Sequence, residues 1–379
     1  MKKLFYVGLL GLLLFEILNV YFIMPMPGSQ KMNSVDVAYF LYRWRWGFRI
    51  LFSSLLLYGY FKSGWKRLWL PLAAVSIAVA AIYIVNFRMA ADHMFYQPEK
   101  LLLVTAAANK VDSERLVIGV ILNGDAKAYP IQYLGFHHQV EDTLGGNLML
   151  VTYCTVCRTG RVFKPLVKGK PEQFRLVGMD HFNAMFEDAS TKSWWRQATG
   201  EAVAGKLKGE KLPEILSTQT SLGEWLRLYP GSLVMQADPS FADEYDSTFK
   251  YETGKSKSKL TGTDSLSWKD KSWIVGVKAG NISRAYDWNK LKKERIISDT
   301  MNNISVALIL AKDNKSFFAF QTPSAFNEIK IRNDTLFFDK NTYRLDGSGI
   351  NTSVSLKRLP ASQEFWHSWR TFNPGTQVY

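Results

Sequence analysis

Long apolar runs are confined to the first part of the chain, whereas the remainder alternates short apolar runs with polar turns. The long runs cover residues 4–24, 47–61 and 68–87, and they approach the ~20 residues that a helix needs to cross a bilayer core. The pattern therefore predicts about three transmembrane helices within residues 1–91. A large soluble part follows from about residue 92.

Two charged residues fall inside these runs. Arg49 lies in the second span, where it must snorkel to the interface or pair with another group. Glu16 lies in the first span, and the other two spans offer it no acidic partner. We therefore expect a helix-packing or protonated role for Glu16 rather than that of a functional carboxylate.

Basic residues predict the orientation of the helices. Lys2 and Lys3 begin the chain, and the short basic loop 62–67 separates the second and third spans. Short basic loops stay in the cytoplasm, so everything after Phe87 is expected outside, with the protein in the cytoplasmic (inner) membrane and its soluble domain facing the periplasm or cell exterior. The alternative for the first run is a signal peptide, but the run is long and no clear small-x-small cleavage site follows it.

The soluble part has the signature of a β-rich α+β domain. Residues 116–122, 148–153 and 304–310 are short apolar runs rich in β-branched residues and bounded by turn dipeptides, so they are predicted strands. Helical periodicity is limited to pieces such as 221–228 and 362–370.

This soluble part also contains an internal repeat. With Gly119 placed over Gly276, further identities fall into line without a gap. Trp225 with Pro230-Gly231 matches Trp369 with Pro374-Gly375 once the second copy is taken as shorter by about a dozen residues. The aligned pairs include Val120 with Val277, Tyr129 with Tyr286, Leu134 with Leu291 and Asp142 with Asp299. We therefore expect two homologous repeats, 92–236 and a shorter 272–379, joined by a connecting segment over 237–271.

Chemistry is expected in the first repeat only. Cys154 and Cys157 are the two cysteines of the chain, and the alignment places Ala311 and Asn314 at the corresponding positions. One interpretation is a structural disulfide, although a loop this short gains only about 2 kcal/mol from closure. A second is a redox dithiol, with Arg158 and Arg161 available to stabilise a thiolate.

The third interpretation is a metal site. Two thiolates with an imidazole suit copper or zinc, and His137 lies shortly before the strand that presents Cys154. Because adjacent residues of a strand point to opposite faces, at most one of His137 and His138 is expected to ligate. His181 is a further candidate that is better explained as a surface residue. A Cys/His nucleophile is also formally available, but a second cysteine three positions along would tend to oxidise it.

Charge and aromatic content bear on partners. The net charge is +14, and some of the basic residues flank the predicted helices. Because an exported domain rarely meets DNA, we expect no nucleic acid as a partner. The expected partners are the membrane and an unknown extracytoplasmic protein or small ligand. The chain carries no nucleotide or haem motif. A non-catalytic interaction domain with bridged cysteines is the alternative function, its tryptophans packing the core or contacting a partner: Trp194, Trp195, Trp225, Trp288, Trp366 and Trp369.

The soluble part resembles the DUF3179 family of uncharacterised bacterial proteins, most closely over residues 117–235. The family usually shows Thr-Tyr-Cys-Pro-Leu-Cys and a His-Glu pair, whereas here Thr155 and Val156 replace Pro-Leu and His138 stands in the place of the Glu. The matching positions include Gly119, Asn123-Gly124, Ala128-Tyr129-Pro130, His137, Asp142, Gly145-Gly146, Thr152-Tyr153-Cys154, Cys157, Gly160, Ser193-Trp194, Gln197, Gly200, Gly205 and Trp225. The resemblance implies the location of a site and no activity.

The leading hypothesis is thus a membrane-anchored extracytoplasmic protein that binds a metal ion or performs thiol redox chemistry at Cys154 and Cys157, with His137 beside them. A functional site requires His137 within reach of a sulfur in an accessible cleft. A structural disulfide would leave His137 remote or the sulfurs sealed off.

Overall fold

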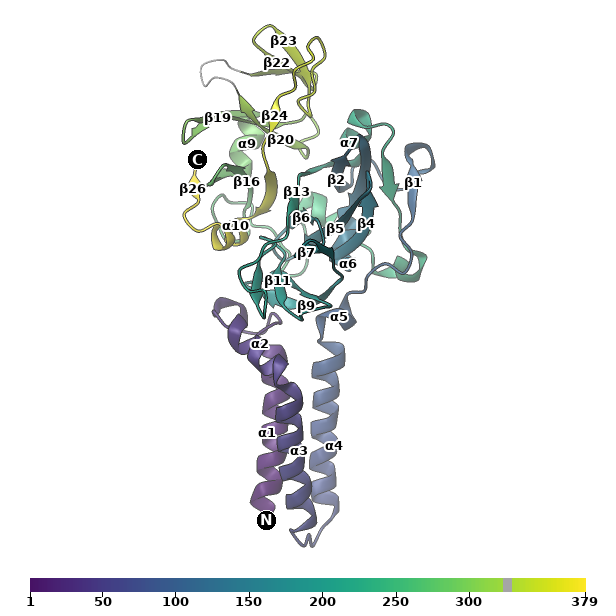
Figure 1. The fold of residues 1–379 in the computed structure, drawn as a ribbon, viewed down its shortest axis with the longest axis vertical. Helices are drawn as coiled ribbons and strands as arrows, with labels where there is room; N and C mark the ends of the chain where they lie inside the picture. Colours follow the sequence, from purple (N-terminus) through teal and green to yellow (C-terminus); the bar gives the residue numbers. More distant parts are fainter. Residues whose placement is uncertain (323–328) are drawn as a thin grey trace. The chain divides into compact units, whose positions relative to one another are not determined.

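The computed structural model describes residues 1–322 and 329–379 of the chain. These residues form two compact units (Figure 1). Unit 1 contains residues 1–96, 172–196 and 201–211, and unit 2 contains residues 97–171, 197–200 and 212–379. Residues 172–196 and 201–211, which the sequence assigned to the first repeat, therefore pack with the N-terminal helices.

Helices make up most of unit 1, and α1 packs against α3 and α4. Two segments, Lys2–Tyr21 and Trp69–Arg88, are long and apolar enough to cross a membrane. The helix over the second predicted span, α3, has 17 residues and falls short of that length. The bounds are α1 Lys2–Tyr21, η1 Ser29–Lys31, α2 Val35–Arg43, α3 Arg45–Phe61, α4 Trp69–Tyr83, η2 Ile84–Arg88 and α5 Ala91–Met94.

Glu16 forms an ion pair that connects two of these helices. The Glu16 side chain is 2% exposed, and Arg49 of α3 donates to both of its oxygens, at 2.7 and 3.0 Å. The Asn86 amide donates to the same carboxylate at 2.9 Å. The pair joins α1 to α3, in line with the helix-packing role expected for Glu16, and it gives Arg49 the partner that a charged residue in an apolar span was expected to need.

A four-stranded sheet completes unit 1, with the order β12-β11-β10-β9. Trp194, Met185 and Val177 of this sheet pack with Ala38 of α2 in one apolar cluster. The strands are β9 Phe174–Asp180, β10 Asn183–Asp188, β11 Trp194–Arg196 and β12 Ala202–Ala204.

The first half of unit 2 consists of two sheets with the orders β1-β15-β3-β2-β14 and β13-β6-β5-β4. Helices α6 and α7 pack against them around one apolar core, which includes Trp225 and Val151. The elements are β1 Leu103–Thr105, η3 Ala106–Ala108, β2 Leu116–Leu122, β3 Asp125–Pro130, α6 Ile131–His137, β4 Gln139–Leu144, β5 Asn147–Cys154, β6 Thr159–Phe163, β7 Leu166–Val167, β8 Lys170–Pro171, β13 Glu214–Ile215, β14 Ser217–Ser221, α7 Leu222–Leu228 and β15 Leu233–Met235.

The second half of unit 2 has the sheet orders β25-β16-β17-β26 and β18-β19-β20-β24, with a third sheet, β21-β22-β23. Its elements are η4 Pro239–Glu244, α8 Lys250–Thr253, β16 Trp273–Ala279, β17 Ile282–Asp287, α9 Trp288–Glu294, β18 Ile296–Met301, β19 Ile304–Leu310, β20 Phe317–Thr322, β21 Lys330–Arg332, β22 Thr335–Phe338, β23 Asn341–Arg344, β24 Lys357–Arg358, β25 Ala361–Phe365, α10 Trp366–Phe372 and β26 Gln377–Val378. The β-rich α+β class of the soluble part is confirmed.

The two halves of unit 2 follow the same order of elements. In each, an antiparallel pair (β2 with β3, β16 with β17) is flanked by an antiparallel strand on one side and a parallel strand on the other. A buried Tyr donates to an Asp in both halves, Tyr129 to Asp142 and Tyr286 to Asp299. The common origin of the two halves by duplication stays a prediction.

Both halves place a glycine directly beneath a tryptophan ring. A Cβ atom added to Gly119 would lie 2.1 Å from the Trp225 ring, and one added to Gly276 would lie 2.2 Å from the Trp369 ring. These strands thus require glycine so that an indole can lie flat on the backbone.

We expect Gly276→Ala to lower the free energy of unfolding by about 1–2 kcal/mol, because the new methyl group overpacks a buried ring. Gly231→Ala is the matched control, since a Cβ there meets no atom within 4 Å. Denaturant unfolding of the purified chain, followed by tryptophan fluorescence, measures both changes. Equal losses in the two variants would contradict the packing argument.

Candidate functional site

The Cys154 to Cys157 loop is a tight turn between two neighbouring strands. β5 ends at Cys154 and β6 begins at Thr159, and these two residues pair in the antiparallel register. Arg158 has a positive φ of 59°, which closes the turn. Both cysteines are free, and they are 1% and 0% exposed. The loop therefore places two thiols inside the protein and not at its surface.

The two thiols lie within hydrogen-bonding reach of each other. Burial raises the pKa of Cys157, and the hydrogen bond and charge of Cys154 raise it further. Ser368, by hydrogen bonding, and Lys271, by its positive charge, act in the opposite direction on the same pKa. Burial dominates, so Cys157 is held as the neutral thiol, next to two groups that favour its thiolate.

Residues of the second half cover this loop. The backbone N–H of Phe365 donates to the Cys157 carbonyl at 3.0 Å, and Lys271 Nζ donates to the Val156 carbonyl at 2.8 Å. His367 Nε2 lies 3.4 Å from the same Val156 oxygen. Burial, followed by the charge of Lys271, lowers the pKa of His367 to about 4. Lys271, at the end of the predicted connecting segment, and residues 365 and 367 of the second repeat, in which no chemistry was expected, thus surround the thiols.

Arg158 of the turn and Arg161 of β6 both contact the second half. Arg158 donates to Gln363 Oε1 at 2.9 and 2.7 Å, and its guanidinium lies 3.8 Å from the Trp273 ring centroid. Arg161 forms a buried ion pair with Glu364 at 2.5 Å. The cation that acts on the Cys157 pKa is Lys271, whereas the sequence had suggested Arg158 and Arg161 for that task.

Glu364 connects the ion pair to the thiols. Its Oε2 accepts hydrogen bonds from Thr159 and Ser368, both at 3.2 Å, and its Oε1 accepts one from Ser362 at 2.8 Å. Ser368 is also the hydrogen-bonding neighbour of Cys157. A continuous polar path therefore runs from Cys157 through Ser368 and Glu364 to Arg161.

The histidines singled out from the sequence lie in different surroundings. His137 Nε2 is 2.7 Å from the Tyr245 hydroxyl, and the His137 ring meets Phe241 edge to face. His138 is buried in a left-handed conformation with Nδ1 3.1 Å from the Phe136 carbonyl. His181 lies in unit 1, 2.5 Å from the Asp180 carboxylate, so it is a paired residue and not a lone surface one.

Within residues 1–322 and 329–379, no three His, Cys, Asp or Glu side chains gather closely enough to hold a metal ion. The predicted ligand set Cys154, Cys157 and His137 is therefore not assembled. The sequence missed Lys271, Glu364, His367 and Ser368, because comparing the two repeats directed attention to the half that carries the cysteines. The prediction of helical periodicity over 362–370 was wrong for its first residues, because 361–365 form strand β25 and α10 begins at Trp366, and Glu364 is therefore a buried charged residue of a strand.

Comparison with protein families gives a match over most of the chain. The family model described as "Protein of unknown function (DUF3179)" matches residues 98–376. Searches of curated proteins and of solved structures find no match. The matched region contains the cysteine loop and all the residues that surround it.

Proposed function

Because the chain belongs to the DUF3179 family of proteins of unknown function, membership assigns no activity to it, and we propose from its buried cysteine pair that it is a membrane-anchored thiol redox protein. Its reactive groups are Cys154 and Cys157, its N-terminal helices anchor it, and its outer domain faces the periplasm or cell exterior. Apolar helices at Lys2–Tyr21 and Trp69–Arg88 support the anchor.

The contact between the two thiols is the observation that carries the proposal. A disulfide needs its sulfurs side by side, and Cys157 is already hydrogen-bonded to Cys154. The positive charge of Lys271 and the hydroxyl of Ser368 both favour the Cys157 thiolate, which is the reactive form of a cysteine. A buried cysteine without such neighbours is chemically inert.

The proposed reaction exchanges two electrons with a disulfide-bearing substrate. The thiolate of one cysteine attacks the substrate disulfide, forms a mixed disulfide and releases the first substrate thiol, which takes a proton. The second cysteine, on losing its proton, attacks the mixed disulfide and releases the second substrate thiol. The protein dithiol becomes a disulfide, the substrate disulfide becomes two thiols, and the reverse direction reduces the protein.

The cysteines are buried and do not line the accessible cleft expected of a functional site, and this sets a condition on the reaction. Sulfurs that are 0% and 1% exposed cannot be reached by a substrate until the segment around Phe365 and Lys271 moves away from the loop. The proposal therefore includes local opening at that cover, and thiol reactivity reports how often it occurs.

Copper or zinc binding by Cys154, Cys157 and His137 is the other half of the original hypothesis. It requires His137 to exchange its Tyr245 contact for a thiolate-bound metal, so the geometry favours redox chemistry over metal binding. A non-catalytic interaction domain is the remaining alternative. In that case the cysteines form a permanent bridge or stay reduced under oxidation.

We expect mild oxidation of the reduced, purified chain to form an intramolecular Cys154–Cys157 disulfide that dithiothreitol reverses. Alkylation of free thiols and mass spectrometry measure this change, with Cys154→Ser as the control that cannot form it. Metal analysis of the same sample, with His137→Ala beside it, tests the metal alternative. Two thiols that stay unreactive in the native chain but react on unfolding would overturn the redox proposal.

A further inference from the structure

Helices α1 and α3 of unit 1 share a polar layer that is complete in itself. Figure 1 shows α1, α3 and α4 side by side, and α1 contacts both of the others. Gly8 of α1 lies against Leu56 of α3, and Glu16 pairs with Arg49, so the two helices run antiparallel. In this layer the Glu16 carboxylate accepts hydrogen bonds from Arg49 and from Asn86.

A second polar layer follows one helical turn nearer the end where α1 ends and α3 begins. It contains Asn19 and Arg45, which share the helix faces of Glu16 and Arg49 because residues three or four positions apart lie on one face. Asn19 is 8% exposed, and its Oδ1 has no hydrogen-bond partner in the described part of the chain. Buried acceptors are nearly always partnered, so this oxygen is available to a donor on a ligand.

Arg45 supplies the cation of the second layer. Its Nη1 donates to the Tyr42 carbonyl at 2.7 Å, and the guanidinium lies 4.0 Å from the Tyr42 ring centroid. Among residues 1–322 and 329–379, no carboxylate lies within 4 Å of it. A guanidinium carries five N–H donors, so most of them are available to an oxygen anion such as phosphate.

Asn19 and Arg45 both line a cavity of about 190 Å³ within unit 1. An apolar cavity of ~150 Å³ holds a molecule of the size of benzene, so a phosphate with a small substituent has room here. Arg49 and Arg175 line the cavity as well, but carboxylates already neutralise them. Asp92 also belongs to the lining, and its carboxylate pairs with Arg175 at 2.7 Å. Arg45 is therefore the cation of the lining with which an incoming anion can pair.

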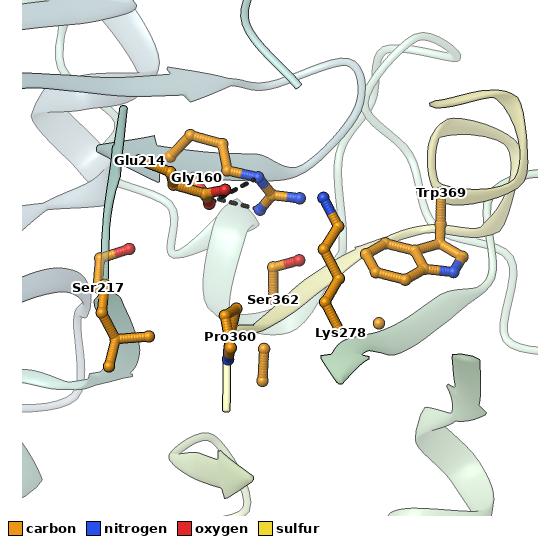
Figure 2. Close-up of a pocket in the computed structure, with 11 residues that line it drawn as sticks. Gly160, Glu214, Ser217, Lys278, Pro360, Ser362 and Trp369 are labelled. Atoms are coloured by element: carbon orange, nitrogen blue, oxygen red, sulfur yellow. Dashed lines mark hydrogen bonds and ion pairs between the residues drawn. The ribbon is translucent and has the colours of Figure 1, made fainter. Parts of the chain in front are cut away.

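The cavity of unit 2 that Figure 2 shows differs in this respect. Dashed lines there join a guanidinium to Glu214, and this guanidinium, of Arg161, also pairs with Glu364. Its charge is compensated by carboxylates of the protein, whereas that of Arg45 is not.

The surroundings of Arg45 match the level at which a bilayer meets water. Its neighbours Trp44 and Trp46 are 61% and 63% exposed, and exposed apolar residues such as Ile50 and Leu51 follow along α3. Tryptophan is enriched at the interface of a bilayer, and apolar helix surface faces its hydrocarbon core. The second layer therefore lies where the phosphates of lipid head groups are found.

We propose that this cavity binds the head group of a membrane phospholipid, with its phosphate on Arg45 and a hydrogen-bond donor, an ammonium or a hydroxyl, on Asn19 Oδ1. Phosphatidylethanolamine and phosphatidylglycerol carry both groups, whereas the quaternary ammonium of phosphatidylcholine has no N–H to donate. The site rests on the membrane anchor of the proposed function and not on its thiol chemistry. Cys154→Ser is therefore expected to bind lipid as the unchanged protein does.

Native mass spectrometry of the full chain, delipidated in detergent and titrated with each lipid, counts the molecules that stay bound. We expect one molecule of phosphatidylethanolamine or phosphatidylglycerol to bind several times more tightly than phosphatidylcholine. Equal binding of all three would overturn the head-group assignment, and equally tight binding of glycerol phosphate would show that the ligand is a soluble phosphate. Carbonate extraction of membranes tests the anchor separately. Release of the chain overturns the anchor and the site together, whereas a retained chain that binds none of the lipids overturns the site alone.

Three variants locate the binding. Arg45→Gln is expected to weaken it about tenfold, because a charge-assisted hydrogen bond is lost. Arg43→Gln is the matched control, since Arg43 is exposed at the end of α2, lies outside the lining and carries the same charge. Asn19→Leu is expected to retain binding but to lose the preference over phosphatidylcholine, a change that misfolding does not produce. Equal losses in Arg45→Gln and Arg43→Gln would show a general attraction to anionic head groups and overturn the site.

Discussion

Replacing Glu364 by Gln is expected to lower the free energy of unfolding by about 3–5 kcal/mol, because it leaves the charge of Arg161 buried without its main partner. Arg161 and Glu364 are 5% and 1% exposed, and their oppositely charged groups lie 2.5 Å apart. Gln has the size of Glu but replaces one of its two accepting oxygens, Oε1 beside Ser362 or Oε2 beside Ser368, by an NH2 group. The loss therefore reports the missing charge and acceptor and not missing volume.

A double variant separates this cause from general disruption. In Arg161→Gln with Glu364→Gln both charges are removed, so most of the lost stability should return, whereas two independent defects would add. Arg370→Gln supplies the surface control, since its ion pair with Asp270 is 48% and 71% exposed and is expected to contribute under about 1 kcal/mol. Denaturant titrations of the unchanged protein, Glu364→Gln, the double variant and Arg370→Gln measure the free energies of unfolding. A loss in Glu364→Gln as small as that in Arg370→Gln would contradict the expected cost of an unpaired buried charge.

Local features of the fold were predictable because they depend on short stretches of sequence. The strand over 116–122 was identified at its observed bounds, Leu116–Leu122, since a continuous run of β-branched and aliphatic residues favours a buried strand. The helix over 222–228 follows Ser221, whose hydroxyl accepts from the Glu224 N–H as an N-cap does. Gly119 and Trp225 aligned with Gly276 and Trp369 because a backbone against an indole tolerates no side chain.

Long-range arrangement was not predictable in the same way. Glu16 and Arg49 are separated in sequence, so their ion pair depends on how α1 and α3 pack, which no local pattern reports. Strands β9 and β10 pack with helix α2, although their sequence continues the first repeat. The sequence of a segment indicates its own secondary structure, but it does not indicate which distant segment it packs against.

Some residues of the candidate site were predictable from the sequence, and others were not. Cys154 and Cys157 were identified by their residue type and spacing, and the structure brings their thiols together. His137 was selected for nearness in sequence, but its imidazole contacts Tyr245. Lys271 and Ser368, which act on the Cys157 pKa, follow the loop by more than a hundred residues. Only the packing of the second half against the first reveals them.

His138 makes the stability of the chain depend on pH. Burial, followed by the nearby charge of His137, lowers the pKa of His138 from 6.5 to about 4, although the Phe136 carbonyl opposes the shift. Between these values the unfolded chain binds a proton at His138 that the folded chain does not bind. Stability is therefore full above about pH 6.5, and it is lost as the pH falls toward 4.

We expect the free energy of unfolding to fall by about 2–3 kcal/mol between pH 7.5 and pH 4.5 through His138 alone. His138→Asn removes this part of the pH dependence, since Asn does not titrate and tolerates the left-handed conformation, φ 61°, of that position. The carboxyl pKa values of Asp180 and Asp246 are lowered, so these groups act mainly below this range. Urea unfolding at the two pH values measures both proteins. An unchanged pH slope in the variant would show that His138 accepts a proton in the folded state, and that its burial does not exclude the charge.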